Sequence, residues 1–285
     1  MARIAVVTDS TVDLAPEELS ALDVVMVPLK VHFGEDTYRD WLDLSVEEFY
    51  AKLTAADPDD LPKTSQPTPG EFSAAFQALA DDGAEGIVSL HISSKLSGTY
   101  ESAVLAAKDA PVPVRVVDTL MVAGAMQLSL RAACAARDAG AGLDDVEKAA
   151  RETAAATELF FLLDTIDFLV KGGRAGRSAG LAAAMLNIKP VLQVRDGLIE
   201  PFKKVKGTRR AIVETAETVA ERTKTLGPVD VVIINALAPD LAKDLEAALV
   251  AAGADMASVS HSDIGAVIGT HVGPGALGVG YAPVR

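Results

Sequence analysis

The chain has 285 residues, 49% of them hydrophobic and 23% charged, so it can bury the core of one large domain or of two compact ones. Its formal net charge of -14 at pH 7 argues against attraction of the whole surface to nucleic acid or to anionic lipid. Its single cysteine, Cys134, cannot form an internal disulfide, and we expect a buried thiol in a reducing compartment.

The first residues lack the layout of a secretory signal peptide. The most apolar stretch, 159–170, is interrupted by two aspartates and falls short of the ~20 apolar residues that a membrane span needs. We therefore expect a cytoplasmic protein without stable membrane insertion and without a nucleic-acid partner.

Short runs rich in Val and Ile alternate with longer Ala-rich and Glu-rich segments of helical period, which is typical of an α/β fold. The predicted strands, in chain order, span 3–9, 23–29, 86–93, 114–118, 159–164, 188–194, 229–235, 257–262, 266–273 and 277–282. Helices are predicted between most of them. Two helix starts, near 46 and near 69, are marked by a hydroxyl residue followed three positions later by a glutamate.

A long predicted helix ends near 157, and a new series of strands begins at Leu159. This pattern predicts two α/β domains, 1–157 and 158–285. We expect a mostly parallel sheet in the first domain and closing antiparallel strands in the second.

Polar segments follow the first and third predicted strands. The carboxyl end of the first strand, where α/β sheets hold ligands, carries Asp9, Ser10 and Thr11. An Asx turn that only caps the next helix explains these residues equally well. The segment 93–99 offers four hydroxyls just before a helix, which suits an anionic oxygen. It lacks the G-x-S-x-G order of hydrolases, so acyl-enzyme chemistry is disfavoured.

The segment from 171 to 210 contains ten Lys or Arg and two acidic residues, against the acidic balance of the whole chain. It begins with KGGRAGR, which does not follow the order of a Walker loop. Two interpretations remain open here: a solvated basic face, or a docking surface for a phosphate or an acidic partner.

One histidine, His271, lies among glycines near the C-terminus. The glycines at 273, 275 and 278 have the spacing of the dinucleotide-binding motif G-x-G-x-x-G. That motif must be followed by a helix and by an acidic residue about 20 positions later, and only seven residues follow Gly278, so the match is not functional. We expect a turn between two closing strands that leaves the imidazole exposed on one side, in a structural or a functional role. The histidines lack metal-ligand spacing, and no metal site is predicted.

Taken together, six segments resemble the DegV family of fatty-acid-binding proteins, which includes the lipid-binding subunits of bacterial fatty acid kinase. In chain order they are VTDSTVDL, KTSQPTPGEF, ISSKLSGTYESA, KGGRAG, IKPVL and GTHVGPGALG. The resemblance extends over nearly the whole chain, and the order of the six segments makes it specific.

The resemblance implies a two-domain α/β protein that holds one long-chain, palmitate-like fatty acid between its domains, with no cofactor and no catalytic residue of its own. The carboxylate would be bound by Thr64, Ser97 and His271. Ser65 and Gly98 would shape the same pocket. We add the residues after the strand at 114–118 as candidates for the pocket wall: Met121, Val122 and Ala123.

The resemblance also implies a partner, a separate kinase subunit that brings ATP and converts the bound acid to an acyl phosphate. The basic loop with Lys171, Arg174 and Arg177 would face this partner. Relatives often carry an arginine ahead of a threonine after the IKP segment; this chain reads KKVKGTRR, and Lys206 or Arg209 would take its place.

The composition suits such a ligand. Burying an alkyl chain contributes about 0.8 kcal/mol per methylene, so roughly 14 of them give on the order of 11 kcal/mol before entropic costs. A carboxylate removed from water needs hydrogen-bond donors, which hydroxyls and an imidazole supply. With aromatic residues at only 5%, an aliphatic pocket fits a flexible tail better than a planar ring.

Two other functions remain open. One is a stand-alone hydrolase or small-molecule kinase that uses Ser97 as nucleophile, His271 as base and Asp9 to orient it. The other is a lipid-sensing regulatory protein whose basic face docks on a partner.

Overall fold

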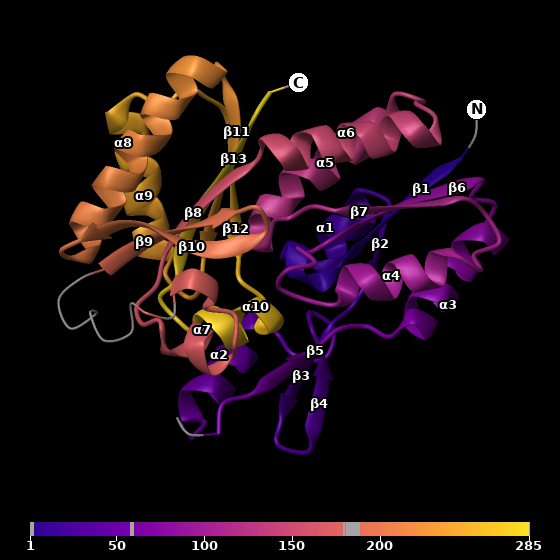
Figure 1. The fold of residues 1–285 in the computed structure, drawn as a ribbon, viewed down its shortest axis with the longest axis horizontal. Helices are drawn as coiled ribbons and strands as arrows, with labels where there is room; N and C mark the ends of the chain where they lie inside the picture. The colour runs from indigo at the N-terminus through magenta and orange to yellow at the C-terminus, as the bar shows by residue number, and fades with distance from the viewer. Residues whose placement is uncertain (1–2, 58–59, 179, 181–188, 285) are drawn as a thin grey trace.

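The computed structural model describes residues 3–57, 60–178, 180 and 189–284 (Figure 1). The strands are β1 Ile4–Asp9, β2 Val24–Val27, β3 Lys30–Phe33, β4 Asp36–Arg39, β5 Lys63–Ser65, β6 Gly86–His91, β7 Val114–Asp118, β8 Glu158–Leu162, β9 Lys189–Arg195, β10 Leu198–Val205, β11 Val229–Asn235, β12 Met256–Asp263 and β13 Leu277–Pro283. The helices are α1 Pro16–Ala21, α2 Val46–Ala55, α3 Pro69–Asp81, α4 Thr99–Ala107, α5 Met126–Asp138, α6 Leu143–Ala156, α7 Asp167–Lys171, α8 Thr208–Leu226, α9 Pro239–Ala252 and α10 Ala266–Val272, with 3-10 turns η1 Ser10–Val12 and η2 Ala123–Ala125.

The N-terminal part is built on a four-stranded parallel sheet in the order β2-β1-β6-β7. Successive side chains of a strand point to opposite faces, so both faces of this buried sheet must be covered. Ala5 and Val7 of β1 pack with residues of α3 and α4, while Ile4 and Val6 belong to a core shared with α5 and α6.

The C-terminal part contains a six-stranded mixed sheet in the order β10-β9-β8-β13-β11-β12. Only β11 and β12 pair in parallel; the other neighbours are antiparallel. Helices α8 and α9 cover its outer face, on the far side from the parallel sheet (Figure 1). The predicted α/β fold, with a parallel sheet first and antiparallel closing strands second, is confirmed.

The inner face of the mixed sheet shares one core with the N-terminal part. Leu159, Phe161 and Ile234 from the mixed sheet belong to the same buried cluster as Val6 of β1 and Met126 of α5. Helix α6 ends at Ala156 and β8 begins at Glu158, close to the predicted boundary at 157. The division into two domains there stays a prediction, because this core is continuous across it.

A third, small sheet in the order β4-β3-β5 was not predicted. Its strands are three or four residues long and carry several charged side chains, so they give little hydrophobic signal. The sheet lies beside α2 and α10 at the lower centre of the molecule (Figure 1). It matters for the site because it positions the segment at 63–65.

The two predicted helix starts are confirmed. Ser45 accepts a hydrogen bond from the backbone of Glu48, and Thr68 accepts one from the backbone of Glu71. Both glutamates reach back to the cap nitrogen and complete a capping box. The predicted burial of Cys134 is also confirmed.

The predicted strand at 266–273 is wrong, because this segment forms helix α10. A short apolar run does not distinguish a buried strand from a buried helix by its period. The decisive contacts come from distant parts of the chain: Gly269 lets the helix approach Phe49 and Tyr50 so closely that any Cβ there would overlap them. His271 therefore lies in the last turn of a helix, and not between two strands.

The strand β10 also escaped prediction. It contains Pro201, which cannot donate a hydrogen bond and is confined to edge strands or irregular positions. β10 is indeed the edge of the mixed sheet, and its register with β9 shifts between Pro201 and Lys203. The strand predicted at 188–194 agrees with β9 from Lys189 onward; Ile188 lies outside the described residues.

Candidate functional site

An apolar cavity lies between the N-terminal and C-terminal parts of the chain. One side is formed by the N-terminal residues Leu29, Ile92, Leu96, Val122 and Ala123. The other side is formed by residues of the mixed sheet and α10, among them Leu159, Phe161, Ile199, Ile234 and Val267. The space between the wall atoms is about 770 Å³, counting the part open to solvent. The cavity is a narrow aliphatic space.

One end of this cavity is polar. Thr64, Ser97, Arg174 and His271 all line it, although they come from four distant segments. Thr64 Oγ1 lies 2.8 Å from His271 Nε2. The polar end therefore joins β5, the loop before α4, the loop after α7 and the last turn of α10.

His271 is neutral at pH 7. Burial lowers its pKa to about 4, with a further contribution from the nearby Arg174 guanidinium. A neutral imidazole carries one N–H. His271 Nδ1 packs so closely against Gly172 that a Cβ there would overlap it, and it makes no hydrogen bond to the described residues.

The pair of His271 and Thr64 keeps one unused donor in either tautomer. With the proton on Nε2, the ring donates to Thr64 Oγ1, and the threonine O–H is free for another acceptor. With the proton on Nδ1, the threonine donates to Nε2, and the Nδ1–H is unused. Nδ1 is buried against Gly172, so the donor that an anionic oxygen requires at the polar end is the Thr64 hydroxyl, which is free in the first tautomer.

Arg174 adds a positive charge to this end. Its Nε donates to the carbonyl of Leu96 at 3.2 Å, and its Nη1 donates to the carbonyl of Gly172 at 2.8 Å. The first bond joins the loop after α7 to the loop that carries Ser97, and the second holds the side chain against its own loop. We predicted Arg174 on a partner-docking face; the structure places its half-buried side chain in the cavity wall.

The loop with Ser97 is fixed from both sides. Ser97 Oγ lies 2.9 Å from Thr99 Oγ1, and its backbone nitrogen donates to the carbonyl of Ser93. The Ser93 hydroxyl in turn donates to the carbonyl of Gly197 in the turn between β9 and β10 at 2.8 Å. The N-terminal and C-terminal parts are thereby connected directly behind the polar end.

Helix α10 is held at its first turn by two buried aspartates. Asp13 accepts from the backbone of Gly265 at 2.9 Å, and Asp40 accepts from the backbone of Ala266 at 2.9 Å. Burial raises the pKa of both carboxyls, that of Asp40 to about 7 and that of Asp13 well above its usual range. Sequence reasoning missed both, because nothing local relates them to a segment more than 220 residues away.

The pocket-shaping predictions separate into two groups. Val122 and Ala123 line the cavity. Ser65 bonds to His32 Nε2 at 2.8 Å on the other face of β5, and it does not line the cavity. Gly98 lies against the side chain of Gln66 beside the polar loop, and Met121 lines a neighbouring cleft instead.

The other predicted docking residues lie on the surface. Lys171 is exposed at the end of α7, and Arg177 is exposed and pairs with Glu200 at 2.6 Å. Lys206 and Arg209 are exposed at the start of α8. The segment from 171 to 177 therefore runs from the wall of the cavity to the outer surface.

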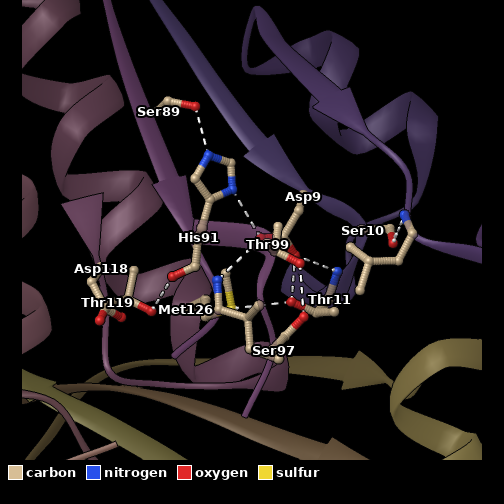
Figure 2. A network of polar contacts seen from close by, with 12 residues as sticks. Asp9, Ser10, Thr11, Ser89, His91, Ser97, Thr99, Asp118, Thr119 and Met126 are labelled. Carbon is tan, nitrogen blue, oxygen red and sulfur yellow. Dashed lines mark hydrogen bonds and ion pairs between the residues drawn. The ribbon is translucent and has the colours of Figure 1, made fainter. Parts of the chain in front are cut away.

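The hydroxyls and the aspartate after β1 form a buried network instead of a ligand site (Figure 2). Asp9 lies 3.0 Å from His91 Nδ1, and His91 Nε2 lies 2.7 Å from Ser89 Oγ. Asp9 also accepts from the backbone nitrogens of Thr11 and Ile92 at 3.0 Å. Asp9, His91 and Ser89 are fully buried and do not line the apolar cavity, which the network reaches only through Ile92.

These contacts bear on the alternative of a stand-alone enzyme. Asp9 pairs with His91, His271 pairs with Thr64, and Ser97 pairs with Thr99. The hydrogen bonds among the described residues therefore do not assemble Ser97, His271 and Asp9 into a nucleophile, base and orienter.

The comparisons with known proteins agree with this geometry. A family model described as "Uncharacterised protein, DegV family" matches residues 3–284. The chain belongs to the DegV family. A DegV domain-containing protein of Streptomyces coelicolor is 40% identical over 277 residues, which cover 97% of each chain.

Solved structures of DegV proteins have the same fold. One from Thermus thermophilus, whose description reads "Fatty Acid Binding of a DegV family Protein", superimposes with a TM-score of 0.92 at 31% identity, covering 99% of this chain and 100% of that one. DegV of Bacillus subtilis, described as a fatty acid binding protein, superimposes with a TM-score of 0.87 at 30% identity over the full length of both chains. Within the described residues, no helix of this DegV protein has the length and apolarity of a membrane span.

Proposed function

We propose that this protein binds one long-chain, palmitate-like fatty acid in the cavity between its two parts. The observation that carries the proposal is a narrow aliphatic space with a single polar end, where Thr64, Ser97, Arg174 and His271 meet. Solved relatives described as fatty acid binding share the fold over the whole chain.

The polar end suits a carboxylate. The unpaired donor of the His271 and Thr64 pair, the Ser97 hydroxyl and the Arg174 guanidinium together offer hydrogen bonds and one positive charge. Hydrogen bonds to an ionised acceptor are roughly twice as strong as neutral ones. The aliphatic wall supplies the affinity, at about 0.8 kcal/mol per buried methylene.

Native mass spectrometry of the protein purified without added lipid tests this proposal. We expect a bound species whose mass corresponds to one fatty acid, and displacement of it by added palmitate. Protein that carries no acid, and that takes none up from an equimolar palmitate solution, would contradict the proposal.

We further propose that the protein is the non-catalytic subunit of a fatty acid kinase and acts in the cytoplasm. A separate subunit would bring ATP and phosphorylate the presented carboxylate. The support is the segment 171–177, which leads from the polar end of the cavity to exposed Lys171 and Arg177. Lys206 and Arg209 extend the exposed basic surface.

Reconstitution distinguishes this role from that of a lipid sensor or a stand-alone enzyme. The loaded protein is incubated with ATP, with and without a purified fatty acid kinase subunit, and acyl phosphate is trapped with hydroxylamine. We expect product only with the kinase subunit, and less product from the Arg177→Glu variant at unchanged lipid retention. Product without the kinase would instead show a stand-alone enzyme, and none in either mixture would favour a sensor.

A further inference from the structure

Two residues at the polar end of the cavity come from elements that Asp40 connects. Thr64 lies on β5 of the small sheet, and His271 lies in the last turn of α10. Asp40 directly follows β4 of the same small sheet, and its backbone nitrogen donates to the carbonyl of Leu29, just before β3, at 3.0 Å. Asp40 and Thr64 therefore belong to one hydrogen-bonded unit.

The side chain of Asp40 binds the first turn of α10. One of its carboxylate oxygens accepts from the backbone nitrogens of Ala266 at 2.9 Å and Val267 at 3.3 Å. Backbone nitrogens in the first turn have no partner inside their own helix, so an acceptor at this place fixes the start of the helix. Asp40 is 1% exposed, so this contact is part of the buried structure.

Helix α10 transmits this constraint to the polar end. At 1.5 Å per residue, His271 lies about 7–8 Å along the helix axis from Ala266. Between them, Gly269 packs so closely against Phe49 and Tyr50 that a Cβ would overlap both. A helix released at its first turn would tilt about this contact, and the tilt would displace His271.

The hydrogen bond at the polar end tolerates little displacement. Thr64 Oγ1 and His271 Nε2 are 2.8 Å apart, and a shift of about 1 Å would take them beyond the distance of roughly 3.2 Å at which such bonds end. When the imidazole donates to Thr64, the threonine O–H is free for a carboxylate. The position of His271 therefore controls whether this hydroxyl is oriented for the ligand.

We propose that Asp40 is a positioning residue of the carboxylate site. It holds the first turn of α10 against the sheet that carries Thr64, and it thereby keeps His271 within hydrogen-bond distance of Thr64. The inference rests on the proposed binding of a fatty acid. It assigns part of the affinity for the head group to a side chain that does not line the cavity.

Comparison of an acid with the alcohol of the same length isolates this effect. Palmitate and 1-hexadecanol have the same number of carbon atoms, but only palmitate is an anion, and the affinities of both are measured by displacement of a fluorescent acid. We expect the ratio of palmitate affinity to hexadecanol affinity to fall about tenfold in Asp40→Ala, as for a lost hydrogen bond to a charged group. Asp40→Asn keeps an acceptor oxygen and should retain most of the wild-type ratio.

Two controls separate positioning from stability. Asp43 accepts hydrogen bonds from Arg39 and makes none to α10 among the described residues, so Asp43→Ala should keep the ratio. Leu249 of α9 is fully buried in the outer core of the C-terminal part and does not line the cavity. Leu249→Ala should lose stability and keep the ratio. If Asp40→Ala does not fold, Asp40→Ser, whose shorter side chain withdraws the acceptor from Ala266, gives the same comparison.

The outcomes separate this inference from the function on which it rests. Wild-type protein that binds neither ligand would overturn the proposed function, and wild-type protein that binds both equally would overturn the carboxylate site; the role of Asp40 falls in both cases. Wild-type protein that prefers the acid, with an unchanged ratio in Asp40→Ala, would overturn only the role of Asp40.

Discussion

His91 and His271 each bond to a hydroxyl residue, yet the two histidines differ in how completely their ring nitrogens are paired. His91 bonds through both ring nitrogens, to Asp9 and to Ser89, and is fully buried. His271 bonds through one nitrogen, to Thr64, while the other has no partner among the described residues.

Several of the incompletely paired atoms among the described residues lie around α10. They include His271 Nδ1, the Tyr50 hydroxyl, and one carboxylate oxygen each of Asp13 and Asp40. The Trp41 indole lies near the Asp13 carboxylate and the Ser10 hydroxyl lies near that of Asp40, but neither makes a hydrogen bond of good geometry with the unpaired oxygen. Buried polar atoms are normally satisfied, and exceptions need an explanation. The first network is fully paired and stabilises the fold, whereas His271 of the second lines the cavity with one nitrogen unpaired among the described residues.

The largest expected effect comes from breaking the satisfied network. Asp9→Ala removes the acceptor of two backbone nitrogens and the partner of His91, so it should lower the free energy of unfolding by about 3–5 kcal/mol. Urea unfolding measures this loss. Asp9→Asn keeps one acceptor oxygen and should lose less. A change below about 1 kcal/mol in Asp9→Ala would contradict a structural role.

A second prediction concerns pH and the support of α10. The pKa of Asp40 is about 7 in the folded protein and near 4 when unfolded, so the folded state binds more protons between these values. Stability therefore falls as the pH rises from about 4 to about 7. Asp40→Asn lacks this titration, and its stability relative to wild type should rise by on the order of 2–3 kcal/mol over that range.

Urea unfolding at several pH values measures this difference, and Asp43 provides the control. Hydrogen bonds from Arg39 lower the pKa of Asp43, so the pH dependence of stability has the opposite sign. The wild type should become more stable relative to Asp43→Asn as the pH rises through the range in which a carboxyl titrates. Parallel profiles for wild type and Asp40→Asn would show that folding does not shift the pKa of Asp40, and would contradict this prediction.

Breaking the incompletely paired network should weaken ligand binding and leave the fold intact. Thr64→Val keeps the shape of the side chain but removes its hydroxyl, and His271→Ala removes the ring. Each should weaken retention of palmitate by about 1–3 kcal/mol, the value of a lost hydrogen bond to a charged group. Displacement of bound palmitate by a fluorescent acid measures this. His91→Ala should show the reverse pattern, and equal patterns in both histidine variants would remove the distinction.

Local signals in the sequence predicted much of this organisation. The α/β fold was predicted from the capping boxes at Ser45 and Thr68 and from the Val-rich and Ile-rich strands. The family was predicted from the order of six motifs. Each of these signals lies within a few residues of the structure that it specifies. The motifs also led to Thr64, Ser97 and His271, which the structure brings to one cavity.

What the sequence could not predict depends on contacts between distant segments. Helix α10 is specified by Asp13 and Asp40, which cap it from more than 220 residues away, and by Phe49 against Gly269. Arg174 enters the cavity wall because Leu96 and Gly172 offer it carbonyl oxygens, and only the folded chain places these together. Charge alone had suggested a surface role for it.

The smallest expected effect concerns Ser65, the neighbour of Thr64 on β5. Adjacent residues of a strand point to opposite faces, and Ser65 accordingly bonds to His32 Nε2 at 2.8 Å while Thr64 faces His271. Ser65→Ala should therefore change palmitate retention by less than about twofold and stability by about 1 kcal/mol or less. A loss of retention as large as that of Thr64→Val would mean that β5 turns its other face to the cavity when the acid binds, which would remove the assignment of Thr64.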